Sequence, residues 1–120
     1  MYNIETFLIF AEGMKRIIAY KHYYRDFLES LQPEDQLKVK RVLTLFSTED
    51  KIPRHFIESI GDGLYQLRIT LPNREARLLY IYDGATLVIL LNCFIKKKRK
   101  TPKQEIEKAK RLKTEYYESK

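Results

Sequence analysis

The residues of this sequence that could do chemistry are mostly cations, and they gather near the C-terminal end. The stretch FIKKKRKTPKQEIEKAK, residues 94–110, has five consecutive cations directly after the most apolar run of the chain. Residues 94–113 hold ten Lys/Arg and two Glu, a local net charge of +8, whereas the whole chain carries +7. Such a concentration is typical of a polyanion partner, most often nucleic acid and less often an anionic membrane or an acidic protein. A solvated charged surface is the alternative.

Two arginines could add to this charge. Arg68 lies on the polar side of one predicted strand, and Arg77 lies near the start of the next. If these strands are neighbours, both side chains reach the sheet face that ends at Lys96–Lys100, where they would bind a phosphate backbone by charge-assisted hydrogen bonds. Cleaving RNA would further require a group that takes the proton of the 2′-hydroxyl, stabilisation of charge on the phosphorane, and a donor for the leaving 5′-oxygen.

Other catalytic groups are scarce in the sequence. His22 lies in KHYY and His55 in PRHF, and we interpret both as structural rather than catalytic. Cys93 is the only cysteine, so an internal disulfide is excluded, and its apolar neighbours indicate a small buried hydrophobe. Paired carboxylates, a Ser–His arrangement, a Gly-rich phosphate loop and metal-ligand spacing are not recognisable. An enzyme of this composition would depend on Lys and Arg, and we predict neither a metal nor a cofactor.

The length and composition predict one domain with a modest core, because the chain has 120 residues of which 44% are hydrophobic. The longest apolar run is far below the ~18 residues of a membrane-spanning helix. The start MYNIETFLIFAEG has no basic region of a signal peptide. We therefore expect a cytoplasmic protein with no membrane partner.

The first half of the chain reads as a strand followed by two helices. Residues 15–20, KRIIAY, are β-branched and aromatic, which favours a short strand. An apolar stripe at helical spacing follows, and Pro33 with two acidic residues behind it indicates the start of a second helix. The pattern predicts a helical hairpin over 23–47.

The second half changes to a period of two. Residues 63–71, GLYQLRITL, put apolar side chains on one face and polar ones, including Arg68, on the other. Residues 76–82 and 86–95 flank Asp83-Gly84, a strong hairpin signal. The last of these strands is apolar on both faces, which predicts a strand that is either central or covered on both sides.

The ends of the chain complete the prediction. TPKQ, residues 101–104, is typical of a helix start with Thr101 as the N-cap and Pro102 at the first helical position. The element order β-α-α-β-β-β-α predicts a small α+β domain with an antiparallel sheet. MKRIIAYKHYY reads like a natural start at Met14, so we expect residues 1–13 to be a dispensable N-terminal extension and 14–120 to be a single domain. The alternative is that IETFLIF adds an edge strand.

Three motifs of the sequence together resemble the RelE/ParE toxin superfamily, and most closely its phage-derived HigB-like branch. They are GLYQLR at 63–68, ARLLYIYDG at 76–84 and FIKKKRKTPKQEIEKA at 94–109. The third is the most specific, because its spacing and its strand-to-helix context both agree. Gln66 stands where that branch usually has Glu, and Lys98-Arg99 replace the commoner Thr-Gln.

The resemblance implies a RelE-like fold, with two helices on one side of the sheet and a C-terminal helix. It also implies a type II toxin that inhibits translation by cutting mRNA on the translating ribosome without a metal, and an antitoxin, of the helix-turn-helix class, encoded by the adjacent gene. The implied catalytic residues are Arg68, Arg77 and Lys97, and the implied RNA- and phosphate-binding residues are Lys96, Lys98, Arg99, Lys100 and Lys103. The alternatives are a ParE-like inhibitor of DNA gyrase and a basic nucleic-acid-binding module without activity.

Overall fold

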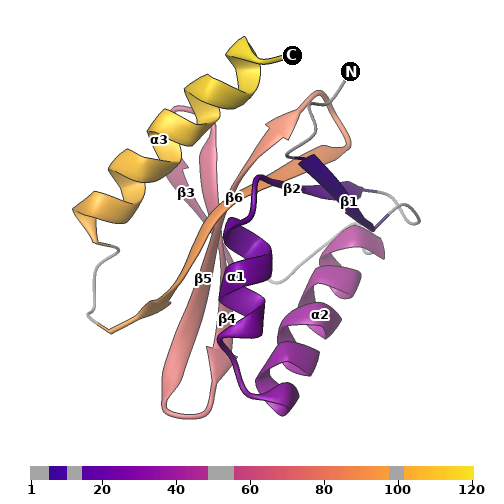
Figure 1. Ribbon diagram of the computed structural model, residues 1–120, viewed down its shortest axis with the longest axis vertical. Helices are drawn as coiled ribbons and strands as arrows, with labels where there is room; N and C mark the ends of the chain where they lie inside the picture. The colour runs from indigo at the N-terminus through magenta and orange to yellow at the C-terminus, as the bar shows by residue number, and fades with distance from the viewer. Residues whose placement is uncertain (1–5, 11–14, 49–55, 98–101) are drawn as a thin grey trace.

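The structure is a computed structural model, and it describes residues 6–10, 15–48, 56–97 and 102–120 (Figure 1). Its elements are, in chain order, β1 Thr6–Phe10, β2 Arg16–Tyr20, α1 Tyr23–Glu29, α2 Pro33–Thr48, β3 Ile57–Gly61, β4 Leu64–Leu71, β5 Arg74–Asp83, β6 Leu87–Lys96 and α3 Lys103–Glu118. The predicted α+β class, the helical hairpin and the C-terminal helix are confirmed. Strand β3, in contrast, was not predicted.

The described strands form one sheet in the order β1-β2-β6-β5-β4-β3. The pairing of β2 with β6 is parallel and every other pairing is antiparallel, so the sheet is mixed rather than wholly antiparallel as predicted. A parallel neighbour needs a long crossover connection, and here the two helices and three further strands separate β2 from β6.

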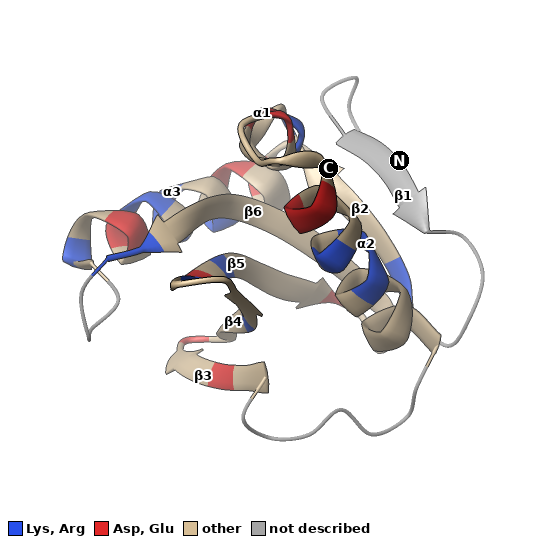
Figure 2. Ribbon diagram, turned by 90° about the horizontal axis from the view of Figure 1, so that it is seen from below, with Lys and Arg blue, Asp and Glu red and all other residues tan. Residues whose placement is uncertain are grey.

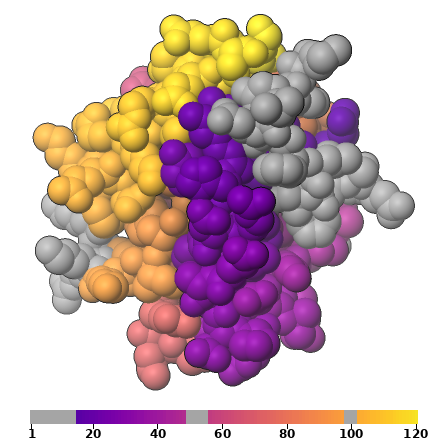
Figure 3. Space-filling model, in the orientation of Figure 1, coloured from indigo at the N-terminus to yellow at the C-terminus, as the bar shows by residue number. Residues whose placement is uncertain are grey.

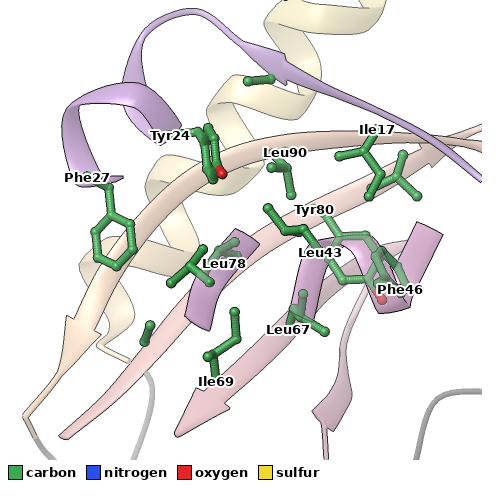
Figure 4. Close-up of a cluster of buried hydrophobic side chains, with 14 of the residues drawn as sticks. Ile17, Tyr24, Phe27, Leu43, Phe46, Leu67, Ile69, Leu78, Tyr80 and Leu90 are labelled. Carbon is green, nitrogen blue, oxygen red and sulfur yellow. The ribbon is translucent and has the colours of Figure 1, made fainter. Parts of the chain in front are cut away.

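Helices cover both faces of this sheet. The larger hydrophobic cluster joins α1 and α2 to one face, and Figure 4 shows Phe27 of α1, Leu43 of α2 and Leu78 of β5 pointing into it. The second cluster joins the other face to α3 through Ala109, Leu112 and Tyr116. Alternate residues of β6 enter the two clusters, so the strand is both central and covered on both sides, where the sequence had predicted one or the other.

Local sequence explains where the helices begin. Helix α2 starts at Pro33, as predicted, since proline is tolerated in a first turn where its missing N–H has no partner to lose. Helix α3 starts at Lys103, one residue later than predicted, and Pro102 occupies the capping position. The Pro102 carbonyl accepts hydrogen bonds from the backbone N–H groups of Glu105 and Ile106. The predicted cap Thr101 lies outside the described residues.

Helix α3 is fixed to the sheet at both ends. Near its start, Asn92 Nδ2 of β6 donates to the carbonyl of Glu105 over 3.0 Å. At its end, the Tyr116 hydroxyl donates to Asp83 Oδ2 over 2.7 Å, and Lys120 Nζ lies 2.8 Å from Asp83 Oδ1. Burial raises the pKa of the Asp83 carboxyl, but the hydrogen bonds from Lys120 and Tyr116 outweigh it, and the net shift is downward. The folded helix therefore favours ionised Asp83.

Helix α3 also touches α1 on the surface of the molecule. Figure 3 shows the two helices adjoining one another, α3 in yellow and orange and α1 in indigo. Lys108 Nζ of α3 lies 4.3 Å from the ring centroid of Tyr23 in α1, which is a cation–π distance. The C-terminal helix is thus held by the first helix as well as by the sheet.

The N-terminal segment contributes an edge strand. Strand β1 pairs with β2 along the sheet edge opposite β3, which is the alternative arrangement for residues 1–13. Whether a chain that starts at Met14 folds without this strand stays a prediction. Among the described residues, the structure has no helix that is both long and apolar enough to cross a membrane.

Candidate functional site

The predicted cations meet on the sheet face that α3 covers, beside the end of β6. Strand pairing places Arg68 of β4 directly opposite Arg77 of β5, and Glu75 of β5 opposite Lys96 of β6. Directly opposite residues of a sheet project to the same face. Arg68, Arg77 and Lys96 are therefore brought together, as expected from neighbouring strands.

Two carboxylates lie among these cations, and sequence reasoning missed both. The Nε of Arg77 donates to Glu75 Oε1, and its Nη1 lies 3.8 Å from Oε1 of Glu58 on β3. Arg68 Nε lies 3.6 Å from the same oxygen of Glu75. We call Glu58, Arg68, Glu75, Arg77 and Lys96 the charged cluster. Figure 2 shows acidic as well as basic segments among strands β3 to β6, so this face is not a purely cationic patch.

Burial separates the two arginines. The Arg77 side chain is only 2% exposed and is enclosed by its two carboxylate partners, whereas the Arg68 side chain is 36% exposed. The Nε atom of Arg68 is buried and makes no hydrogen bond with any described residue. An incoming anion would therefore meet Arg68 directly, while Arg77 would act through the carboxylates that it holds.

The charge of Lys96 is coupled to both arginines. Partial burial lowers the pKa of the Lys96 ammonium, and the neighbouring positive charges of Arg77 and Arg68 lower it further. Glu75 and Glu58 act in the opposite direction without reversing the net effect. Lys96 is thus inside the charged cluster, and its proton is held less tightly than that of an ordinary surface lysine.

Gln66 links the edge strand β3 to the cluster. Its side chain is fully buried, and its Nε2 donates a hydrogen bond to Glu58 Oε1. At this position the sequence has Gln, whereas the HigB-like branch that it resembles usually has Glu. A second carboxylate here would repel Glu58, whereas the amide donates to it. The sequence alone gave no signal for this pair, because it is formed by the pairing of β4 with the unpredicted strand β3.

Two other predicted site residues, the catalytic candidate Lys97 and the phosphate-binding candidate Lys103, do not join the charged cluster. Lys97 follows β6 and Lys103 begins α3, and both are exposed. Neither takes part in the ion pairs that join the glutamates to the arginines. Lys98, Arg99 and Lys100 lie outside the described residues.

The histidine and the cysteine that the structure describes, His22 and Cys93, take no part in the ion pairs of the cluster. His22 Nδ1 is 2.7 Å from Asp26 Oδ2 at the start of α1, and the histidine ring packs on Tyr23. His55 lies outside the described residues. Burial raises the pKa of the Cys93 thiol and the nearby Glu105 charge raises it further, so Cys93 is a poor nucleophile. Within the described ranges, no group of three His, Cys, Asp or Glu is arranged to hold a metal ion.

A comparison with known protein families matches a segment of the chain that contains the whole charged cluster. No curated protein matches the chain. The model of a family described as phage-derived protein Gp49-like (DUF891) matches residues 26–114, a span that includes strands β3 to β6 and most of α3. This match extends over more than half of the chain. The protein therefore belongs to the phage-derived Gp49-like family, a RelE-like family of toxins from toxin–antitoxin systems.

Proposed function

We propose that this chain is a HigB-like toxin that cleaves mRNA on translating ribosomes without a metal ion. The observation that supports this best is the charged cluster, in which Arg68 and Lys96 share one sheet face with a buried arginine. The three cations and two carboxylates of the charged cluster sum to a net charge of +1. This charge matches the single negative charge of a phosphodiester. The Arg68 side chain is partly exposed, so its guanidinium is the one that an incoming phosphate would meet.

The residues of the cluster then take separate roles. Arg68 and Lys96 contact the scissile phosphate, and Arg68 stabilises the charge that grows on its oxygens in the transition state. Arg77 holds Glu75 and Glu58 in place rather than touching RNA, because its guanidinium is enclosed. As the bond to the leaving 5′-oxygen breaks, Lys96 donates a proton to that oxygen, a transfer that its lowered pKa assists.

The exit of β6 supplies the affinity for RNA. The segment between the end of β6 and the start of α3 is basic. Its cations are Lys97, Lys98, Arg99 and Lys100, and Lys103 follows as the first residue of α3. Both elements are packed into the core, so a basic segment is carried between two rigid ends. This segment contacts the phosphate backbone of mRNA and of ribosomal RNA. The antitoxin, a helix-turn-helix protein encoded by the adjacent gene, neutralises the toxin in the cytoplasm.

The test is to add the purified chain to translating ribosomes and to map the ends of a defined mRNA. Arg68→Ala should slow cleavage on the order of 10²–10³-fold while the protein stays folded. Arg41→Ala, a substitution of an exposed arginine on α2, is the matched control and should cleave normally. Intact mRNA together with broken DNA in arrested cells would contradict the proposal and favour a ParE-like gyrase inhibitor. RNA binding without cleavage or arrest would favour a basic binding module.

A further inference from the structure

The proposed cleavage, on which this inference rests, needs a group that accepts the proton of the attacking 2′-hydroxyl. His22 is bound to Asp26 at the start of α1, and the Cys93 thiol is buried. The charged cluster, in contrast, holds two carboxylates next to the proposed phosphate site. A carboxylate can serve as a general base if it is within reach of the substrate and free to take a proton.

The two glutamates differ in how much of the carboxylate is already engaged. Glu75 Oε1 accepts from Arg77 Nε and also lies 3.6 Å from Arg68 Nε, and its side chain is 27% exposed. Glu58 is 50% exposed, and its nearest guanidinium nitrogen, Arg77 Nη1, is 3.8 Å away. Glu75 is thus committed to pairing with arginine, whereas Glu58 remains open to an RNA ribose that approaches from solvent.

Gln66 fixes Glu58 in this position. Glu58 of β3 and Gln66 of β4 are direct cross-strand neighbours, and the Gln66 Nε2 donates to Glu58 Oε1. Gln66 is fully buried, so it has little freedom to release its partner. A neutral amide orients the carboxylate without competing for the proton, as a second glutamate at that position would do.

We propose that Glu58 accepts the proton of the 2′-hydroxyl and that Gln66 is its positioning residue. The O2′–H bond breaks and its proton passes to the Glu58 carboxylate, while O2′ forms a bond to phosphorus. The P–O5′ bond breaks, and the 5′-oxygen takes a proton from the Lys96 ammonium. The products are a 2′,3′-cyclic phosphate and a 5′-hydroxyl. Glu58 then releases its proton to water, and Lys96 takes one back from water.

The experiment measures single-turnover cleavage of a defined mRNA on translating ribosomes, with the full chain, as a function of pH. Glu58→Gln should slow cleavage on the order of 10²–10⁴-fold and abolish the fall in rate at low pH. Glu58→Ala should recover part of its rate when formate is added, since formate can replace the missing carboxylate. Gln66→Leu should be slower than wild type but keep the low-pH fall, because the Glu58 carboxylate is still present. Glu29→Gln, at an exposed position on α1, is the control and should cleave normally.

Several outcomes would overturn the assignment. They are wild-type cleavage by Glu58→Gln, a persisting low-pH fall in that variant, and an absence of formate rescue in folded Glu58→Ala. Loss of the low-pH fall in Glu75→Gln with its retention in Glu58→Gln would transfer the role to Glu75. Wild-type protein that leaves the mRNA intact would overturn the ribonuclease proposal itself, so the two failures are distinguishable.

Discussion

Arg77 provides the sharpest test of the cluster's architecture, because the structure predicts that it is essential for stability. Its side chain is 2% exposed and is enclosed by Glu75 and Glu58. Arg77→Ala would leave these two carboxylates without their shared counter-charge. Arg68→Ala removes a side chain that is 36% exposed and lies 3.6 Å from its glutamate, so the same chemical change should cost far less there.

The expected magnitude follows from the burial of the partners. Removing one member of a buried ion pair costs roughly 3–5 kcal/mol. Glu75 and Glu58 are 27% and 50% exposed, so water can partly solvate them once the arginine is gone. We therefore expect a loss near the lower end, about 3 kcal/mol, for Arg77→Ala. For Arg68→Ala we expect a loss of no more than about 1 kcal/mol.

Thermal unfolding of the purified chain, followed by circular dichroism at neutral pH, measures this difference. A loss of about 3 kcal/mol should lower the Tm by on the order of 10 °C in a domain of this size. Adding Glu75→Ala to Arg77→Ala should cost less than the sum of the single changes, because the two residues form one pair. Equal Tm changes for Arg77→Ala and Arg68→Ala would refute the reasoning, since burial would then not distinguish them.

Three further predictions concern other parts of the chain. The folded-state pKa of Asp83 lies below its ordinary value, so its stabilisation is present above the ordinary pKa and is lost as the pH falls through the folded-state pKa. Asp83→Asn should therefore lower the Tm at neutral pH but not in strong acid. A chain that begins at Met14 should fold, as judged by its melting curve, and should still arrest growth; an unfolded product would show that β1 belongs to the core. Replacing Lys98 by Thr and Arg99 by Gln should flatten the slope of log RNA affinity against log salt by about one to two units, since each contact to single-stranded phosphate adds roughly −0.7. An unchanged slope would mean that these two cations only solvate the surface.

Local patterns predicted most of the architecture. The alternation in residues 63–71 correctly placed Gln66 and Arg68 on one face of β4, and Asp83-Gly84 correctly marked the β5–β6 hairpin. Strand β3 was missed because IESIG is short, and its pairing with β4 shifts register between Ser59 and Gly61, so its apolar residues do not alternate. The parallel β2–β6 pairing was missed because no local pattern reports which strands become neighbours.

The carboxylates of the site were also missed, because local patterns do not report which residues strand pairing brings together. Glu75 and Lys96 become neighbours only through the register of β5 with β6, and Glu58 meets Gln66 only through a strand that was not predicted. Lys96, in contrast, was recognisable because it begins a run of five consecutive cations. A charge that is local in sequence is therefore visible early, whereas the partners that neutralise it require the sheet pairing.

The sheet order places the N-terminal strand β1 away from the site. The charged cluster is assembled from β3, β4, β5 and β6, which are four adjacent strands of the sheet, while β1 lies at the opposite edge and reaches β6 only through β2. The family match begins at residue 26, after β2, and still covers every residue of the cluster. Removing β1 would expose the edge of β2, a cost in stability and in resistance to aggregation, but it would leave each contact of the cluster in place. A truncated chain that folds but has lost cleavage would therefore contradict the site assigned here, rather than the fold.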